Sequence, residues 1–536
     1  MNAQCRRPRA ARPATKGRAF LLVSILLLLS ALFATACGVD LANPPRVATA
    51  TARAAAPATP TAAPLVVAAP TGEQGAVPAV AGTPAASNTE LTIWVNETSP
   101  EHRAALASMA NDFADRYGTN VAVQLVSPAL LPELVNTAVL SGTLPDLILH
   151  PIEYTAGWAA NGVLDAGAAD EVIDRLGRDT FDPAALELAT VGGLVAALPS
   201  DGYHQVLLYR ADWFEARGLQ PPDTYSAMAA AAEGIYDREA LISGLVVPTE
   251  SNLVTTHQAF EQIALANGCQ LIDKAGEVTI LDEVCREALA HYFTTINRFS
   301  PPGVQTDTSA RNALLSGRTG MIVTSPAILP DLAGLNPDAL PTCAECDGTD
   351  PINYLARNTG ILTAITGSAT GATPAAFGNV TNLGITTAAD REAAQAFAQY
   401  WFEVSYPDWL AVNPERKVPM RLGTAESPRE FIEAWGTQPL AGSDLSLSDV
   451  YGPEVVAQLR DGIAAAPRWG IREGYGALVT RLYDELTFSI VLQEMLSGYF
   501  PVDTTLREAY RRTIELIPNY AFPIVEEVTP TPTPES

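Results

Sequence analysis

Residues 90–150 read ELTIWVNETSPEHRAALASMANDFADRYGTNVAVQLVSPALLPELVNTAVLSGTLPDLILH, and their pattern sets the architecture of the chain. Three short apolar runs are typical of strands: 90–96, 121–126 and 145–150. Residues 101–117 carry Ala and Leu at helical spacing, and residues 129–141 also predict a helix. Strands that alternate with helices form βαβ units, so we expect an α/β fold with a parallel sheet.

The remainder of the folded part extends this pattern. Residues 192–219 predict a turn, a short strand, a break between Pro199 and Gly202, a second strand and a helix, and such a segment suits a crossing between two lobes. Further strands are expected at 243–248, 319–326 and 377–386. Further helices are expected at 253–267, 283–297, 309–316, 389–404, 474–497 and 504–516.

The N-terminus predicts export. Six Arg and Lys side chains precede an apolar run at 19–33, which is shorter than the roughly 20 residues of a membrane-spanning helix. Small residues and then Cys37 follow, which resembles the bacterial lipobox, in which the cysteine is lipidated. We therefore expect residues 1–36 to be a signal peptide and Cys37 to anchor the protein on the outer face of the cell membrane. A plain secretory peptide with an incidental cysteine is the alternative.

Two biased segments flank the folded part. Residues 37–88 are rich in Ala, Pro and Thr and cannot bury enough apolar surface to fold, so we expect a disordered tether after the lipidated cysteine. Residues 524–536 form a similar Pro/Thr tail. What remains, 89–523, is longer than one core usually supports, so two lobes are expected.

The charge of the chain excludes some partners. The formal net charge is −26 with the basic leader included, which argues against nucleic acid and against anionic lipid heads. A polyanionic ligand is disfavoured for the same reason, although a local basic pocket could override the total.

Four cysteines remain once Cys5 and Cys37 are set aside, and an even number in an exported chain favours disulfides: Cys269, Cys285, Cys343 and Cys346. The first two flank a hairpin-like segment, and a bridge between them would close one local loop. The last two form a CxxC, which could instead be half a zinc site or a redox pair. No second CxxC or His pair accompanies it, so we expect a local disulfide there, no metal and no cofactor.

Several stretches together resemble the extracellular solute-binding protein family 1, the maltose-binding-type sugar-binding proteins. They are residues 90–118, LPDLILHPIEYTAGWAANGVLDAG (144–167), ALPSDGYHQVLLYRADWFEARGLQPPDTY (197–225), ALLSGRTGMIVTSPAIL (313–329) and the last two helices. The resemblance covers residues 90–520. It implies a periplasmic-binding-protein-like fold, with two α/β lobes joined by hinge strands and a ligand cleft between them. Many relatives carry a Trp after the Ser325-Pro326 equivalent, and Ala327 stands here instead.

The resemblance also implies an organisation and a mechanism. Lobe 1 is expected to comprise 89–202 and about 385–430, lobe 2 to comprise 203–376 and about 465–520, with crossings near 200–206, 376–386 and 430–465. The lobes close over a small solute, a mono- or oligosaccharide, and a monomer docks on ABC permease subunits in the membrane.

Ligands of open α/β sheets bind beyond the carboxyl ends of strands, and sugars need polar side chains and an aromatic face. Where this rule and the resemblance agree, the candidate ligand-binding residues are Glu97, Glu153, Tyr154, Asp201, Tyr203, Glu250, Asn252, Ser325, Trp469, Arg472 and Tyr475.

Each candidate could instead have a structural role. Glu97 could favour the first turn of a helix, and Asp201 and Tyr203 could be hinge-turn residues. Glu250 and Asn252 could cap the following helix. Trp469 could be a core residue, and Arg472 could pair with Glu473 or Asp461 on a solvated face.

Three functions compete. Solute capture for import is the first. An enzyme such as a glycosidase would need two placed carboxylates, and no spacing singles out a pair. The sequence has no GxSxG elbow, P-loop or GxGxxG after a strand, so we expect no catalysis. A ligand sensor or surface interaction protein on the same fold, without transport, is the third.

Overall fold

The computed structural model describes residues 90–348 and 350–520, which belong to one compact unit of the chain. The expected signal peptide, Cys37, the tether and the Pro/Thr tail lie outside the described residues. Two separate sheets carry the fold, and each is the centre of one lobe.

The first lobe is built on a six-stranded sheet with the order β13-β6-β12-β3-β1-β2. Its strands are β1 (Glu90–Val95), β2 (Asn120–Leu125), β3 (Leu147–Pro151), β6 (Leu198–His204), β12 (Gly378–Ile385) and β13 (Val418–Pro419). The strands β2, β1 and β3 are parallel, and β12 runs antiparallel to both β3 and β6. The parallel βαβ arrangement predicted from residues 90–150 is confirmed.

Side chains alternate between the two faces of this sheet. Ile93 and Leu149 point into one cluster, whereas Ile148 points into another on the opposite face. Helices cover both faces, as a parallel sheet requires. They are α2 (Pro100–Tyr117), α3 (Leu131–Ser141), α4 (Ile152–Ala160), α5 (Ala166–Leu176), α14 (Arg391–Tyr400) and α15 (Tyr406–Leu410).

The second lobe surrounds a three-stranded antiparallel sheet with the order β8-β7-β9. Its strands are β7 (Val206–Arg210), β8 (Met321–Thr324) and β9 (Thr359–Leu362). The surrounding helices are α7 (Ala211–Arg217), α8 (Tyr225–Ile235), α9 (Val254–Ala266), α10 (Glu283–Phe299), α11 (Asp307–Leu315), α12 (Leu329–Leu332), α13 (Tyr354–Asn358), α19 (Thr487–Leu496) and α20 (Val502–Glu515). The helix α18 (Gly476–Asp484) contacts both lobes, since its Leu482 lies in the core of this lobe and its Tyr483 in a cluster of the first.

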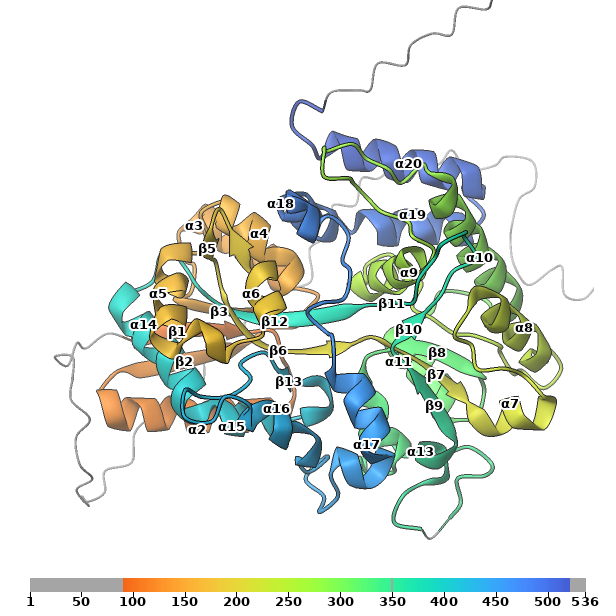
Figure 1. Cartoon of the computed structure of the whole chain (residues 1–536), viewed down its shortest axis with the longest axis horizontal. Coiled ribbons are helices and arrows are strands. Elements are labelled where there is room, and N and C mark those ends of the chain that lie inside the picture. The colour runs from red at the N-terminus through yellow and green to blue at the C-terminus, as the bar shows by residue number, and fades with distance from the viewer. Residues whose placement is uncertain (1–89, 349, 521–536) are drawn as a thin grey trace, which may run out of the picture. The chain divides into compact units, whose positions relative to one another are not determined.

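Two strands connect the lobes. Only Gln205 separates β6 from β7, so the chain passes directly from one sheet into the other, and β12 returns beside β6 from the short strand β11 (Ala375–Ala376) (Figure 1). Gly202 is needed at this crossing because a Cβ there would lie 2.5 Å from the Asn379 carbonyl oxygen. The crossings expected near 200–206 and 376–386 are confirmed.

Residues 430–465 form the helices α16 (Glu430–Ala434) and α17 (Leu447–Arg460). Their apolar side chains join a cluster that spans both lobes, with Ile152 and Val418 from the first and Leu208 and Ile322 from the second. The remaining short strands are β4 (Thr190–Val191), β5 (Leu194–Val195) and β10 (Ala364–Ile365), and the helix α6 (Pro183–Leu188) contacts β6.

Two expected elements are wrong. Residues 243–248 make single bridges at Ser243 and Val246 and form no strand. The helix expected at 474–497 is two helices, α18 and α19, because Leu486 adopts a left-handed conformation with φ 52° and interrupts the helix. Neither Gly nor Pro marks that break in the sequence, so the helical periodicity predicted one continuous helix across it.

Both expected disulfides are present, Cys269–Cys285 and Cys343–Cys346. Within the described ranges, no three His, Cys, Asp or Glu side chains are gathered as ligands of a metal ion. No helix of residues 90–520, leaving out position 349, is long and apolar enough to cross a membrane.

Candidate functional site

A buried charged cluster joins the two lobes. Glu153 lies in the first turn of α4, directly after β3 of the first lobe, and Glu261 lies on α9 of the second lobe. Arg468, from the segment between α17 and α18, lies between the two carboxylates, and all three side chains are about 1% exposed. We call these three residues the interlobe cluster.

Arg468 satisfies its guanidinium within the protein. Its Nε donates to Glu261 Oε1 at 3.2 Å, and Nη1 donates to the Gly378 carbonyl of β12 at 3.2 Å. Its Nη2 donates to the Tyr483 hydroxyl at 3.2 Å and lies 3.8 Å from Glu153 Oε2. Burial lowers the pKa of Arg468, but the neighbouring negative charges, that of Glu261 above all, outweigh it and raise that pKa. The residue therefore stays charged between the lobes.

Glu153 connects the first lobe to α9. Gln258 Nε2 donates to Glu153 Oε1 at 3.2 Å, and Glu153 Oε2 has no hydrogen-bond partner among the described residues. Burial raises the pKa of Glu153, and the Arg468 charge opposes that rise. A buried carboxylate oxygen without a donor is available to accept a hydrogen bond from a hydroxyl group.

A second group of polar side chains lies at the crossing strands. Tyr203 of β6 accepts a hydrogen bond at its hydroxyl from Asn379 Nδ2 of β12, at 3.2 Å. Arg416 Nη2 donates to Glu97 Oε1 at 3.0 Å, and the Arg416 guanidinium lies 5.9 Å from the Tyr203 ring centroid. We call Glu97, Tyr203, Asn379 and Arg416 the crossing group.

The crossing group is surrounded by protein yet partly accessible. Arg416 keeps 31% of its side chain accessible and Glu97 keeps 13%. Burial nevertheless raises the pKa of Tyr203, against the opposing Arg416 charge, and Glu153 of lobe 1 and Asp307 of lobe 2 raise it further. Side chains from both lobes therefore influence this hydroxyl, and accessible atoms among buried ones are what a ligand contacts.

Asp201 lies deeper, inside the first lobe. Its Oδ2 accepts from Ser200 Oγ at 2.7 Å and from Trp409 Nε1 at 2.8 Å. Lys417 is 1% exposed, and its Nζ donates to the Trp409 carbonyl at 3.1 Å. Burial lowers the pKa of Lys417 to about 7, opposed chiefly by Asp201. The Asp201 side chain thus bonds to groups inside the first lobe and holds the crossing strand β6 in place, which agrees with a structural role as a hinge residue.

Two aromatic candidates are core residues. Trp469 is 1% exposed, donates from Nε1 to the Cys269 carbonyl at 2.9 Å and packs against Phe260 and Phe488. Tyr154 is 3% exposed and stacks on Trp158 in a cluster of the first lobe. Neither ring face is open in this arrangement, so the expectation that Trp469 stacks on a sugar is replaced by a core role.

The remaining candidates are dispersed. Glu250 and Asn252 follow no strand and do not cap α9, whose N-cap is Leu253, and Asn252 is exposed. Ser325 directly follows β8 and is the N-cap residue of a short 3-10 helix, without a side-chain cap bond. Arg472 Nη1 donates to Glu187 at 2.9 Å, which replaces the expected pairs, and Tyr475 packs against the second core.

The first lobe also packs against α18, the helix that contacts both lobes. Gly157 of α4 donates its backbone N–H to Thr480 Oγ1 of α18 at 3.1 Å, and Thr480 Oγ1 donates to the Glu153 carbonyl at 2.6 Å. A Cβ at Gly157 would lie 2.5 Å from Thr480, so glycine permits this close helix crossing. Helix α18, which also contributes to the core of the second lobe, is therefore held against the first lobe beside the interlobe cluster.

Four charged residues of the site were not predicted from the sequence: Glu261, Arg416, Lys417 and Arg468. Lys417 is one of three lysines in the chain, which is a weak signal that could have singled it out. Arg468 precedes the Trp469 that was chosen, but charged residues are mostly exposed, so burial of the arginine was not expected.

Comparisons with known proteins place this geometry in a family. The model described as bacterial extracellular solute-binding protein matches residues 108–406, more than half of the chain. The putative ABC transporter periplasmic-binding protein YcjN of Escherichia coli (strain K12) is 22% identical over 367 residues, which cover 66% of this chain and 79% of that protein.

Solved structures share the fold. An ABC transporter solute-binding protein of Thermotoga lettingae, bound with alpha-D-tagatose, superposes with a TM-score of 0.61 at 20% sequence identity. The match covers 80% of this chain and 99% of the Thermotoga lettingae chain. A sugar transporter of Arthrobacter chlorophenolicus with bound laminaribiose has a TM-score of 0.63 at 16% sequence identity. That match covers 80% of this chain and 100% of the neighbour's chain. The two-lobed fold expected from the sequence is confirmed.

Proposed function

Since this chain belongs to the family of bacterial extracellular solute-binding proteins, we propose that it captures a small, neutral, polyhydroxylated solute between its lobes and delivers it to an ABC-type permease. The observation that carries the proposal is the crossing group. It places a phenol, an amide, a carboxylate and a guanidinium on and beside the two strands that connect the lobes.

The charge balance favours a neutral solute. Glu97 is paired with Arg416, Glu153 lies beside Arg468, and Asp201 lies near the Lys417 ammonium. Each of these three carboxylates thus lies near a basic side chain of the protein, and Glu153 shares Arg468 with Glu261. What remains for a ligand is hydrogen bonding, with unpaired acceptor oxygens on Asn96, Glu153 and Asn379. Hydroxyl groups are donors that match these acceptors.

The carbohydrate class is supported by analogy. The two structural neighbours carry tagatose and laminaribiose, and a sugar needs an aromatic face as well as polar partners. With Ala327 in place of a Trp and Trp469 buried, Tyr203 is the part-accessible aromatic side chain of the crossing group. We therefore assign the sugar-facing ring to Tyr203.

Capture works by closure around the crossing strands. Binding a solute between Tyr203 of the crossing and residues of both lobes stabilises the arrangement in which α4 and α18 touch. The closed form is then the one presented to the permease. No bond of the solute changes in this scheme, and the protein acts as a monomer without catalysis.

The N-terminal signals complete the proposal. Residues 1–36 direct export, and lipidation of Cys37 holds the protein at the outer face of the cell membrane. Radiolabelled fatty acid incorporation that is lost in Cys37→Ser tests this part alone.

Thermal-shift and calorimetric titration with tagatose, laminaribiose and polyols test capture. A solute at 100 times its Kd should stabilise the protein by about 2.7 kcal/mol. Tyr203→Phe removes only the hydroxyl and should weaken binding by about 1–3 kcal/mol, because it leaves polar groups unpaired. Tyr499→Phe is the matched control, since Tyr499 is 73% exposed away from the crossing. Equal affinity in both variants, or no response to any saccharide or polyol, contradicts the proposal.

A further inference from the structure

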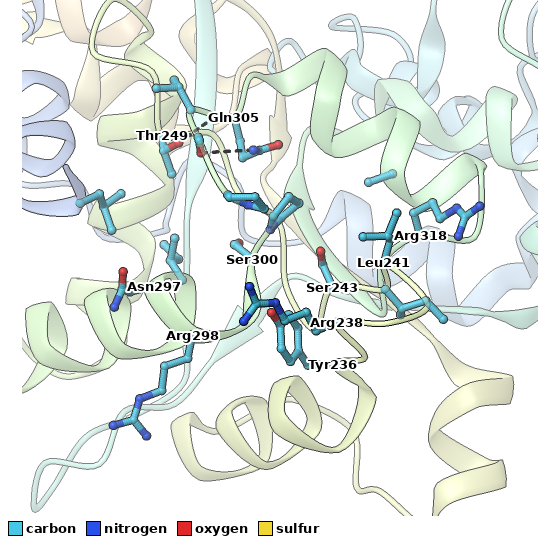
Figure 2. A pocket seen from close by; sticks show the side chains of 18 of the residues that line it. Tyr236, Arg238, Leu241, Ser243, Thr249, Asn297, Arg298, Ser300, Gln305 and Arg318 are labelled. Atoms are coloured by element: carbon cyan, nitrogen blue, oxygen red, sulfur yellow. Dashed lines mark hydrogen bonds between the residues drawn. The ribbon is translucent and has the colours of Figure 1, made fainter. Parts of the chain in front are cut away.

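A cavity of about 870 Å³ lies in the second lobe, outside the residues of the crossing group and the interlobe cluster. The ends of α10 and α19 and the loops at 236–243 and 300–305 form its walls (Figure 2). Its volume is within the range of about 300–1,000 Å³ typical of small-molecule sites. The cavity is large enough to hold a ligand of its own.

Unpaired cations surround this cavity. Arg238 and Arg298 are exposed and have no carboxylate or hydrogen-bond partner among the described residues. Arg318 donates to the Ala240 carbonyl at 2.9 Å and to no carboxylate in the part of the chain described. In the view of Figure 2, Arg238 crosses the middle of the cavity, whereas the side chains of Arg298 and Arg318 extend outward at opposite sides. Three guanidinium groups without a carboxylate partner among these residues thus line one cavity, although the chain has a net charge of −26.

One acidic side chain lines the same cavity and is held by the backbone of its loop. It is Asp237, whose Oδ1 accepts hydrogen bonds from the backbone N–H groups of Glu239 and Ala240, each at 2.9 Å. The Asp237 carboxylate is therefore used to shape the loop. Three guanidinium groups against one carboxylate leave an excess of positive charge at the cavity, and arginine binds carboxylates in a bidentate way.

The interior of the cavity offers apolar contacts and one free hydroxyl. Leu241 is 74% exposed and Val304 is 51% exposed, both at the cavity. Leu241 also adopts φ 57°, a left-handed conformation that costs a non-glycine residue energy and is often found at functional sites. Ser243 is 5% exposed, lines the cavity, and its hydroxyl has no hydrogen-bond partner among the described residues.

From these features we propose that the second lobe binds an amphipathic carboxylate, with its head on Arg238 and its aliphatic body against Leu241 and Val304, while Arg298 adds positive charge at the edge of the cavity. The Ser243 hydroxyl donates a further hydrogen bond to the carboxylate. This site is separate from solute capture and goes beyond it. A small anion would make the contacts with arginine but not the apolar contacts, and an aliphatic alcohol would make the apolar contacts but carry no charge. Both should therefore bind more weakly than an amphipathic carboxylate.

Isothermal titration of the purified full chain with decanoate, below its micelle concentration, tests the site. Acetate and inorganic phosphate probe the head alone, and decanol probes the body alone. Decanoate is expected to bind at least about tenfold more tightly than each of these, and Arg238→Met/Arg298→Met is expected to weaken it at least about tenfold. Arg286→Met, on the same helix as Arg298 but outside the cavity, should leave the affinity unchanged.

Two results overturn the inference: decanoate that binds no better than acetate, phosphate or decanol, and decanoate that binds the double arginine variant as well as the parent. Tyr203→Phe should not change decanoate binding, and the double arginine variant should keep its response to saccharides. Failure of one site is thereby distinguished from failure of the other.

Discussion

Replacing Arg468 by Met should destabilise the protein strongly, and the loss should depend on pH. The substitution leaves Glu153 and Glu261 buried at about 1% exposure, where Arg468 lies 3.8 and 3.2 Å away from them. Removing one partner of a buried ion pair costs about 3–5 kcal/mol, because the remaining charge is uncompensated. That corresponds to roughly a hundredfold to several thousandfold in the folding equilibrium.

The pH dependence follows from Glu153. Burial already raises its pKa, and the Arg468 charge holds that rise back, so the variant raises the pKa further. When the pKa of a carboxyl is higher in the folded state than in the unfolded state, the protein loses stability as the pH rises through the folded-state pKa. The deficit of Arg468→Met should therefore be larger at pH 8 than at pH 5, because the raised pKa makes protonation of Glu153 easier at the lower pH.

Urea unfolding followed by tryptophan fluorescence at both pH values measures this deficit. Arg460→Met is the control, since Arg460 pairs at 2.7 Å with Asp461, whose side chain is 65% exposed, and surface pairs contribute about 0–1 kcal/mol. Adding Glu261→Gln to Arg468→Met should recover part of the loss. A deficit below about 1 kcal/mol at pH 8, or one equal at the two pH values, would refute the reasoning.

Three further outcomes are expected. Gly157→Ala should separate α4 from α18, because the added Cβ would lie 2.5 Å from the Thr480 side chain, and the radius of gyration in X-ray scattering should increase. Adding Thr480→Gly to this variant should restore the original radius of gyration. Burial lowers the pKa of His150 to about 4 from 6.5, so stability should fall by about 3 kcal/mol from this residue alone as pH drops from 6.5 to 4, and His150→Gln should flatten that slope in denaturation curves. Replacing Cys269 and Cys285 by Ala should cost about 3 kcal/mol by calorimetry, since their bridge closes a loop with a separation of 16 residues.

The disulfide and glycine predictions each have an internal comparison. Removing Cys343 and Cys346, which are 3 residues apart, should cost less, about 2 kcal/mol, because a shorter loop restricts the unfolded chain less. Gly234→Ala tests a helical glycine whose added Cβ meets only the Leu219 side chain, at 3.3 Å, and should leave the scattering profile unchanged. A larger effect of the short-loop pair, or expansion in Gly234→Ala, contradicts the corresponding argument.

The fold could be predicted because its signals are local. Residues 90–150 alternate apolar strands with helical spacing, and β1, α2 and β2 fall within one residue of the expected limits at both ends. The passage through Gln205 was marked by Pro199 and Gly202. In contrast, the break at Leu486 carries no glycine or proline, and the segment 243–248 has the composition of a strand without a partner strand along its length.

The site could be predicted only in part. Glu97, Glu153 and Tyr203 follow strands or lie in a crossing, so the strand-end rule located them at the junction of the lobes. Arg468 and Lys417 could not be found in this way, because their burial depends on partners far along the chain, Glu153 and Asp201. Trp469 shows the converse: its neighbours in sequence suggested a ligand-facing loop, and distant aromatic residues enclose it.

Helix α18 belongs to two cores at once, with Leu478 and Leu482 in one and Val479 and Tyr483 in the other. A rotation that separates the lobes must therefore expose the apolar side chains on one face of this helix to water. A denaturant that disrupts either core also removes packing contacts from the other core, because the two cores share this helix. We expect the two halves to melt in a single transition, and any solute that tightens one half to protect the amide protons of the other.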